Sequence, residues 1–421
     1  MAVSSASVAP LQKEKQPAIP LTPAGLPSPK TTLSLTTLGA ALLLSYVIFN
    51  GFGLKQGVLY TLGILLGYTL FHARFGFTSA FRQLLSVGQG EGLRAHMLMI
   101  AVACLLFTPI LSLGIGFFGT KPEASVEPLG VSLVVGSFLF GIGMQLGGGC
   151  ASGTLYAAGG GRTAAFLTLA GFIAGSVIGA YHWEFWTKQM PSFPAFSLAE
   201  NTPLGYGGAL VVQLAVFGII AWLTVVIAKR KNPPVRKPLP TARGWVRIVR
   251  GSWPLWAAAI LLAVLNAVTL TVKGEPWGIT SAFALWGSKA AQAMGVDVAS
   301  WGYWSGERAA ALQSSVFADA TSVMDFGLVL GALLASSIGG VFTLSKLNGR
   351  LAVGSIIGGL LMGYGARLAY GCNIGAYFAG IASFSLHGWV WMILALAGSV
   401  VGMWFRPLFG MKNPKPTDFV C

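Results

Sequence analysis

Apolar stretches of about 20 residues recur along nearly the whole chain, and this feature most constrains what it can fold into. A helix of that length is long enough to cross the hydrocarbon core of a bilayer. Hydrophobic residues make up 54% of the 421 residues and charged residues 9%, whereas a soluble domain carries roughly 25% charged residues. The sequence therefore predicts an all-α polytopic membrane protein.

Ten apolar runs are predicted to be spanning helices. They are Thr32 to Asn50, Val58 to His72, His96 to Phe118, Gly130 to Gly147, Thr163 to His182, Gly207 to Ala228, Trp253 to Val272, Met324 to Phe342, Leu351 to Leu368 and Trp389 to Phe405. Two further apolar segments, Phe75 to Leu85 and Trp277 to Met294, are short for a span and are predicted to be re-entrant or surface helices.

The same pattern predicts the domain organisation. Residues 1–31 form a disordered N-terminal tail, 32–228 the first half of a transmembrane domain, 229–250 a basic cytoplasmic loop, 251–405 the second half, and 406–421 a cytoplasmic C-terminal tail. Polar, proline-rich composition without an apolar segment is typical of disorder and not of a signal peptide. Insertion into the membrane is therefore expected to depend on the first spanning helix.

Basic residues predict the orientation. Residues 229–250 contain many Lys and Arg and no acidic residue, and such short loops stay in the cytoplasm. Alternation of the spans then places Arg82, Arg162, Lys346 and both termini in the cytoplasm, and most acidic residues, Asp325 included, outside. No Asp or Glu is expected deep inside a span, which favours channel-like passage, or coupling to consumption of the substrate, over a proton relay.

The chain contains an internal repeat. Gly76, Thr78, Ser79, Ala80 and Phe81 recur in order as Gly278, Thr280, Ser281, Ala282 and Phe283. A second pattern, Gly136, Gly141, Gly143, Gly149, Cys150 and Gly153, recurs as Gly358, Gly363, Gly365, Gly371, Cys372 and Gly375. One unmatched span, Gly207 to Ala228, separates the halves, so the second half is predicted to be inverted and the two Gly-Cys loops to converge near the bilayer midplane.

The two Gly-Cys loops, residues 147–154 and 371–376, are the predicted binding site. Each breaks a helix at membrane depth, and exposed backbone N–H groups at helix N-termini bind anions. A polarizable thiol suits a sulfur-ended anion. The candidate binding residues are Cys150, Cys372, Gly148, Gly149, Ser152, Gly371, Asn373 and Arg367.

Alternatives remain for these residues. The glycines can serve close helix packing, and Arg367 can extend to the interface instead of binding a substrate. Cys104 is expected to be a packing residue and Cys421 to lie in the disordered tail. No CxxC pair or neighbouring His indicates a metal site, a disulfide framework or a cofactor, and no basic face with interleaved aromatic residues indicates nucleic-acid binding.

The chain resembles the YeeE/YedE family of membrane proteins. The resemblance rests on GGGCASG around Cys150, on GARLAYGCNIGAYFAGIASFSLHGW from Gly365 to Trp389, and on the two TSAF segments. It implies a multi-pass protein of the bacterial inner membrane that takes up thiosulfate and is not an enzyme, in which the two cysteines pass the anion by hydrogen bonds. It also implies a TusA-like sulfurtransferase as a possible cytoplasmic partner.

Thiosulfate uptake through a narrow pathway between the Gly-Cys loops is thus the leading hypothesis. One alternative is transport of a selenium compound or of another sulfur species, because the resemblance includes YedE-type members linked to selenium handling. Another is a membrane subunit that relays sulfur covalently through its thiols to a cytoplasmic sulfurtransferase. No thiol-activating group adjoins either cysteine in the sequence, so the covalent alternative has no support from the residues.

Overall fold

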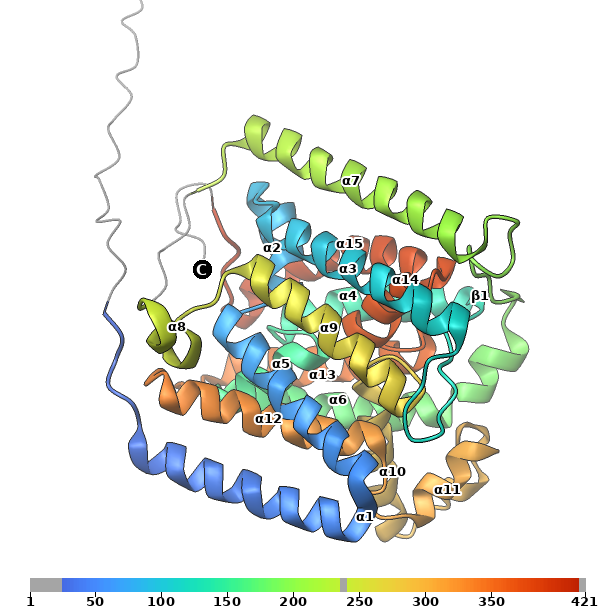
Figure 1. Cartoon of the computed structure of the whole chain (residues 1–421), viewed down its shortest axis with the longest axis horizontal. Coiled ribbons are helices and arrows are strands. Elements are labelled where there is room, and N and C mark those ends of the chain that lie inside the picture. Colours follow the sequence, from blue (N-terminus) through green and yellow to red (C-terminus); the bar gives the residue numbers. More distant parts are fainter. Residues whose placement is uncertain (1–24, 235–240, 416–421) are drawn as a thin grey trace, which may run out of the picture.

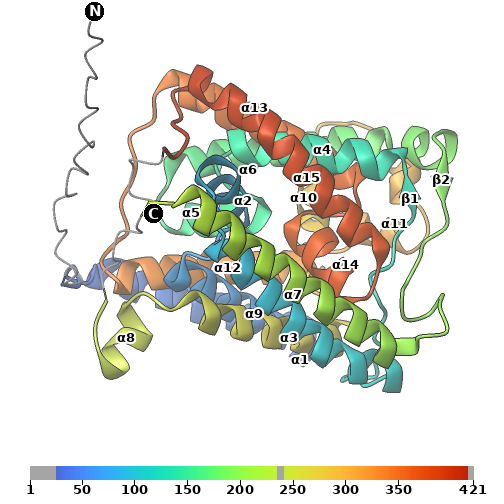
Figure 2. The same cartoon turned by 90° about the horizontal axis from the view of Figure 1, so that it is seen from above.

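The computed structural model describes residues 25–234 and 241–415, which form a bundle of helices (Figures 1 and 2). Its helices are α1 (Thr31–Ala73), α2 (Phe77–Val87), α3 (Glu91–Leu113), α4 (Val131–Leu146), α5 (Ala151–Gly159), α6 (Thr163–Tyr181), α7 (Gly205–Lys231), α8 (Gly244–Arg250), α9 (Leu255–Lys273), α10 (Thr280–Ala293), α11 (Glu307–Gln313), α12 (Ala320–Ile338), α13 (Gly349–Leu368), α14 (Ala379–Ala382) and α15 (Leu386–Phe405). Short π or 3-10 turns are η1 (Phe185–Gln189), η2 (Val298–Ser300), η3 (Gly302–Trp304), η4 (Asn373–Phe378) and η5 (Arg406–Phe409). Strands β1 (Leu129–Gly130) and β2 (Ser192–Phe193) form a small antiparallel pair.

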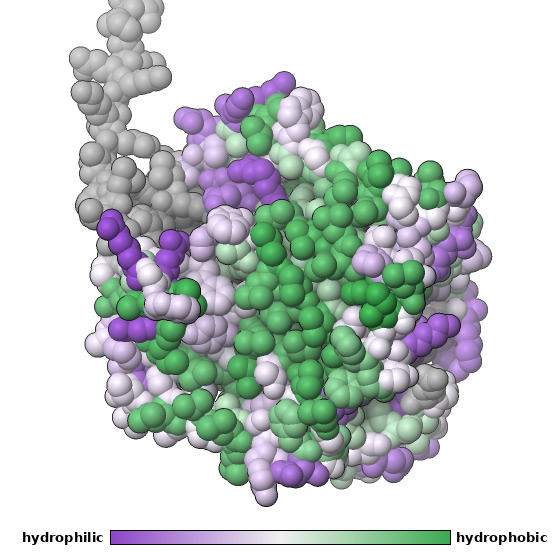
Figure 3. Space-filling model, in the orientation of Figure 1, coloured by the Kyte–Doolittle hydropathy of each residue, from purple (hydrophilic) through white to green (hydrophobic). Residues whose placement is uncertain are grey.

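Nine helical segments within residues 25–234 and 241–415 are long and apolar enough to cross a membrane. The prediction of an all-α polytopic membrane protein is therefore confirmed. Helices dominate because a chain in lipid must satisfy its backbone hydrogen bonds internally. An apolar band crosses the middle of one face of the bundle, and hydrophilic groups gather toward its edges, as a lipid-facing surface requires (Figure 3).

The first two predicted spans belong to one helical segment, α1, which breaks at Gly53. This glycine has φ 84°, a conformation that glycine adopts without steric strain. The Tyr60 hydroxyl donates to the Ala41 carbonyl at 3.1 Å, so residues on either side of the break lie side by side. The two parts of α1 are thus two limbs that fold back on each other, each long enough to span.

The two TSAF segments are short helices within the fold. Helix α2 has 11 residues and α10 has 14, lengths of about 16 and 21 Å that are too short to cross a bilayer. Phe81 and Phe283, the last residues of the two segments, are both fully buried. Of the two predicted alternatives, re-entrant or surface helices, the surface position does not fit, since tertiary packing covers these segments; the re-entrant alternative stays a prediction.

Helices of the two sequence halves pack against each other in matching pairs. Helix α1 packs on α12 and α3 on α9, while α6 packs on α13 and α4 on α15. Helices α4 and α13 cross between these pairs, where a Cβ on Gly136 or Gly143 would lie 2.7 Å from the carbonyl oxygen of Gly365 or Gly358, respectively. These repeated glycines serve close helix approach, which is the packing role small residues have in membranes.

Segments that the sequence assigned to tails and a loop are partly built into the bundle. Lys229 to Lys231 form the end of α7, and residues 244–250 form α8. Lys30 donates its N–H to Ser337 O at 2.9 Å, and Arg406 donates to Gln145 O at 2.5 Å. The predictions for residues 1–24, 235–240 and 416–421, Cys421 included, lie outside the described residues.

Candidate functional site

The first Gly-Cys loop connects α4 to the short helix α5. Gly148 has φ 77°, a left-handed conformation that favours glycine, and it turns the chain so that Cys150 precedes α5. The Cys150 carbonyl accepts from the Thr154 N–H at 2.8 Å, and the Cys150 sulfur lies 3.3 Å from the Ser152 hydroxyl. The thiol therefore sits at the N-terminus of α5, beside a hydroxyl that can donate or accept.

The second Gly-Cys loop connects α13 to η4 in the same manner. Tyr370 has φ 58° and Gly371 φ 150°, and the turn they form delivers Cys372 to the start of η4. The Cys372 sulfur accepts from the Ile374 N–H at 3.4 Å. Asn373 is fully buried, and neither polar atom of its amide has a hydrogen-bond partner among the described residues, so it can still bind a guest.

The two thiols lie close together in the interior. Cys150 is 2% exposed and Cys372 0% exposed, and α5 contacts η4. The sequence predicted that the loops converge, and the packing brings both cysteines to one buried region.

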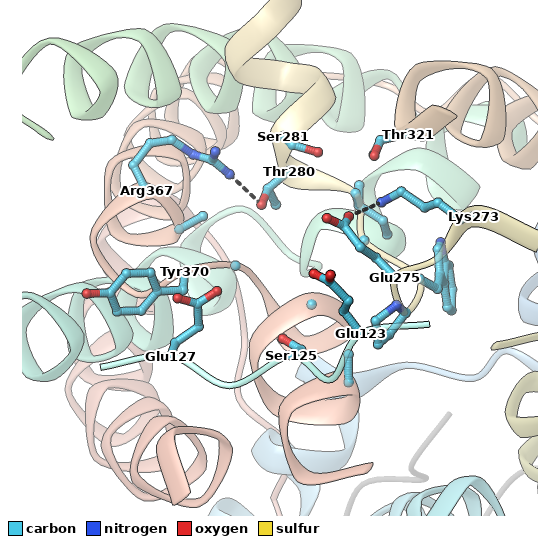
Figure 4. Close-up of a pocket in the computed structure, with 18 of the residues that line it drawn as sticks. Glu123, Ser125, Glu127, Lys273, Glu275, Thr280, Ser281, Thr321, Arg367 and Tyr370 are labelled. Carbon is cyan, nitrogen blue, oxygen red and sulfur yellow. Dashed lines mark hydrogen bonds and ion pairs between the residues drawn. The ribbon is translucent and has the colours of Figure 1, made fainter. Parts of the chain in front are cut away.

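A cavity of about 500 Å³ opens beside the second loop (Figure 4). We name it the mixed-charge vestibule because its lining includes both bases and acids. The charged residues of this lining are Lys273, Arg308, Arg367, Glu123, Glu127, Glu275 and Asp319. Gly371 and Gly375, which belong to the second Gly-Cys loop, line this cavity, so the vestibule lies beside Cys372.

A second cavity, of about 300 Å³, opens beside the first loop. We name it the basic vestibule because its charged lining residues are Arg82, Arg162, Lys346 and Arg406, and none of the described residues that line it is acidic. Gly147 to Gly149, Gly153 and Thr154 line it at the first Gly-Cys loop. This vestibule leads toward Cys150.

The two vestibules lie at opposite ends of α13. Leu351 and Ser355 line the basic vestibule, and Ala366 and Arg367 line the mixed-charge vestibule. The stretch from Ser355 to Ala366 corresponds to about 17 Å along a helix axis at 1.5 Å per residue. Since neither thiol is among the residues that line either cavity, the cysteines occupy the closed region between two openings.

The predicted site residues therefore divide into three groups. Gly148 and Gly149 line the basic vestibule, and Gly371 and Arg367 line the mixed-charge vestibule. The remaining four, Cys150, Ser152, Cys372 and Asn373, are buried between the vestibules. All eight belong to one continuous region of the fold, but no single cavity holds them all.

Arg367 is held inside the protein by neutral partners. Its guanidinium donates to the Tyr303 hydroxyl and, at 2.6 Å, to the Thr280 hydroxyl, and its side chain is only 6% exposed. Tyr303 and Thr280 therefore hold the guanidinium in the vestibule, and its role in binding an anion stays a prediction. Thr280 belongs to the second TSAF segment, which thus positions a cation.

The corresponding place in the first half is Gln145, and two arginines gather there. Arg82 donates to the Gln145 side-chain oxygen at 3.4 Å and Arg406 to its carbonyl at 2.5 Å. Gln145 in turn donates to the carbonyl of Thr78, in the first TSAF segment, at 3.5 Å. Sequence analysis missed both arginines as site residues, because only folding brings α2 and η5 to the end of α4.

Asp325 contradicts the expectation that no acidic residue lies deep inside a span. Helix α12 begins at Ala320, four residues before the predicted start, and Asp319 caps it by accepting from the Ser322 N–H at 2.7 Å. Asp325 consequently lies within the helix and is 0% exposed. Neither of its carboxylate oxygens has a hydrogen-bond partner within residues 25–234 and 241–415.

Two carboxyl groups of the mixed-charge vestibule have shifted pKa values. Burial raises the pKa of Glu127 to about 7, an effect that Arg308 opposes and Glu275 strengthens. The nearby Lys273 ammonium, 3.0 Å from a Glu275 oxygen, lowers the pKa of Glu275. Near neutral pH Glu127 therefore titrates, whereas Glu275 stays ionised.

Two openings on a helical membrane bundle, separated by a buried polar region, are characteristic of a membrane transport protein. Residues 72–401 match the Sulphur transport family, so the chain belongs to that family, which includes YeeE and YedE proteins. No group of three or more His, Cys, Asp or Glu in the described part of the chain can hold a metal ion.

Named relatives agree with this class. The thiosulfate transporter TsuA of Spirochaeta thermophila is 27% identical over 348 residues, covering 81% of this chain and 96% of the relative. TsuA of Escherichia coli strain K12 is 24% identical over 353 residues, covering 81% and 92%. A protein named probable transporter YedE, also from E. coli K12, is 32% identical over 158 residues, covering 37% and 38%. The family and these names indicate a transporter of a sulfur compound, not an enzyme.

Proposed function

We propose that the protein takes up thiosulfate, which passes between the mixed-charge and basic vestibules through the buried region that holds Cys150 and Cys372. The observation that carries the proposal is the position of the two thiols between openings at opposite ends of α13. Two full-length relatives are named thiosulfate transporters. The substrate is therefore a small dianion with a soft sulfur end, which a thiol can contact.

In this proposal the protein lies in the bacterial inner membrane with the basic vestibule and both termini in the cytoplasm. Support comes from the positive-inside rule, because Arg82, Arg162 and Lys346 line that vestibule together. The mixed-charge vestibule then faces outward. Thiosulfate would enter there beside Arg367.

The proposal includes an inverted repeat with the site between the halves. Support comes from the crossing of α4 and α13, where Gly136 approaches Gly365 while Gly143 approaches Gly358. Gly358 and Gly365 are the repeat partners of Gly136 and Gly143, respectively. This reciprocal pairing is what an antiparallel, two-fold related pair of helices produces.

Passage depends on weak, replaceable contacts. Backbone N–H groups at the starts of α5 and η4, together with the Ser152 hydroxyl and the Asn373 amide, would replace part of the water lost from the anion. The two thiols would offer weak hydrogen bonds in sequence. Binding must be strong enough for entry and weak enough for release, and uncharged donors meet both needs better than a buried cation.

The test is uptake of radiolabelled thiosulfate into liposomes that contain purified protein. We expect Cys150→Ala and Cys372→Ala each to reduce the initial rate at least tenfold, because each removes a donor from the closed region. The matched control is Cys104→Ala, since Cys104 is also buried but lies on α3, 3.8 Å from Ile381 O. Uptake at the wild-type rate in both site variants contradicts the proposed role of the cysteines.

The two alternatives predict different outcomes, one in competition for uptake and one in mass spectrometry of the protein. Stronger competition by selenite or sulfite than by unlabelled thiosulfate would assign transport of another sulfur or selenium species. A persulfide detected by mass spectrometry on Cys150 or Cys372 after incubation with thiosulfate would assign covalent relay, with a TusA-like sulfurtransferase as its cytoplasmic acceptor. Rapid uptake without persulfide supports passage of the intact anion.

A further inference from the structure

The feature that the proposed pathway leaves unexplained is Asp325. Its side chain is completely buried in α12, and its two carboxylate oxygens lack a hydrogen-bond partner in the described part of the chain. An ionised carboxylate in such a place is strongly unfavourable, so the group is expected to be protonated when no cation is near. Ionisable groups inside membrane proteins commonly mark ion or proton pathways.

Asp325 lies between the mixed-charge vestibule and the cysteines. Thr321, one helical turn before it on the same face of α12, lines the vestibule. On its other side α12 packs on α5, the helix that begins directly after Cys150. The carboxyl group is therefore one turn below a water-accessible cavity and adjacent to the proposed anion path.

The charged groups that act on the Asp325 carboxyl are Asp319 and Lys273, both of which line the vestibule. Helices α1, α5, α8 and α10 also pack against α12. Titratable residues that they carry are Tyr46, Lys55, Tyr60, Tyr68 and His72 on α1, Tyr156 on α5, Arg247 and Arg250 on α8, and Lys289 on α10. Lys289 is bound to Leu312 O at 2.7 Å and Ser314 O at 2.6 Å, and Arg250 to Ile338 O at 3.1 Å, so these two cations have other partners.

The energetics of uptake call for a companion cation. A membrane potential of 100 mV, negative inside, lowers the equilibrium internal concentration of an anion about 50-fold for each charge. For a dianion such as thiosulfate the factor is about 2500-fold. Passive passage would thus keep the anion out, whereas entry with protons offsets the charge.

We propose that Asp325 binds a proton that is carried inward with the sulfur anion, which makes the protein a proton-coupled symporter. This inference rests on the proposed function. A proton from water in the mixed-charge vestibule adds to a carboxylate oxygen of Asp325 and leaves toward the cytoplasm when the anion leaves. No electrons are transferred.

Electrostatics provides the coupling. An anion near Cys372 repels a second negative charge and so favours the protonated carboxyl. By thermodynamic reciprocity, the protonated carboxyl favours binding of the anion to the same extent. The anion and the proton therefore bind and leave together, while the ionised carboxylate repels an anion that arrives without a proton.

The experiment compares accumulation with exchange in liposomes, with the membrane potential held at zero by potassium and valinomycin. With the exterior one pH unit more acidic than the interior, we expect the wild-type protein to accumulate labelled thiosulfate about tenfold for each coupled proton. In Asp325→Asn the accumulation ratio should fall to about 1. Exchange of labelled for unlabelled thiosulfate should remain within about threefold of wild type, because exchange requires no release of the proton.

Asp325→Glu keeps the titrating group and should retain pH-driven accumulation, and the exposed Asp297→Asn is the matched control. Accumulation by Asp325→Asn at the wild-type level overturns the inference. Loss of exchange in that variant also overturns it, since the carboxyl would then serve binding or folding. If the wild-type protein exchanges thiosulfate but does not respond to the pH gradient, only the proton coupling is contradicted. If it carries no thiosulfate, the proposed function itself is contradicted.

Discussion

The two vestibules differ in how they present charge to an anion. In the basic vestibule, four cations converge without an acid among the described lining residues. In the mixed-charge vestibule, the Lys273 ammonium is paired with Glu275, but Arg367 is held by the hydroxyls of Tyr303 and Thr280. Because neutral partners leave its charge uncompensated, Arg367 is the cation to which we assign the entering anion in the proposed pathway.

In the proposed pathway this difference in charge gives the two ends different tasks. A vestibule with both signs of charge can select and release, since its acids limit how strongly an anion is held. A vestibule with only bases raises the local anion concentration. With the basic vestibule on the cytoplasmic side, this field would draw the anion from the buried cysteines toward release.

The strongest test of whether the vestibules open to opposite sides is to label them from each side of the membrane. We expect Ser125→Cys, in the mixed-charge vestibule, to react with an impermeant maleimide only from outside, and Ser345→Cys, in the basic vestibule, only from inside. The effect should be all or none, because the closed region separates the two cavities. Labelling of both positions from one side contradicts the proposed orientation.

Removal of Arg367 should have the next largest effect. Arg367→Gln keeps a polar side chain but loses the charge, and a hydrogen bond to a charged group contributes roughly 1.5–3 kcal/mol. We therefore expect KM for thiosulfate uptake to rise roughly 10- to 100-fold. Arg350→Gln, on an exposed site of the same helix, is the matched control. An unchanged KM in Arg367→Gln would assign the guanidinium to packing alone.

The smallest expected effect comes from Glu127. Its pKa, raised by burial to about 7, means that the carboxyl is largely neutral below pH 7 and negatively charged above it. The charged form repels an anion in the vestibule, so KM of the wild-type protein should rise between pH 6 and pH 8. Because a repulsion that solvent screens is worth under about 1 kcal/mol, the expected rise is about two- to threefold. Glu127→Gln should remove that part of the pH dependence.

A control separates the effect of Glu127 from that of Asp325. Measurements of exchange at equal pH on both sides exclude any driving force from a proton gradient. Under this condition, and in the Asp325→Asn background where position 325 no longer titrates, the Glu127→Gln variant should show the low-pH KM at every pH. A variant that retains the wild-type pH profile would show that another group controls anion entry.

Much of the architecture could be predicted because the membrane imposes it. Apolar runs long enough to span must become helices, and each of the ten predicted spans overlaps a helix. The two TSAF segments were identified, but not their burial, since an isolated sequence does not reveal which faces other helices cover. The start of α12 was missed because Asp319 caps the helix earlier than the apolar pattern suggests.

The candidate site was predicted in part. The Gly-Cys loops stood out because they are repeated, and in the structure the elements that follow Cys150 and Cys372, α5 and η4, contact each other. Arg82 and Arg406 were missed because they lie far from the loops in the sequence and have no counterpart in the repeat. Asp325 was missed because a carboxyl near a helix start looks like a surface charge until packing buries it.

The sequence by itself determined that the chain is a polytopic helical membrane protein, that residue patterns recur within it, and which two Gly-Cys loops interrupt helices. These properties follow from hydropathy and residue order, which are local. Only the tertiary structure decided which charges share a cavity, which thiols are sealed from both openings, and that a carboxyl lies beneath one of them. Those properties depend on distances between helices far apart in the chain, and packing alone sets such distances.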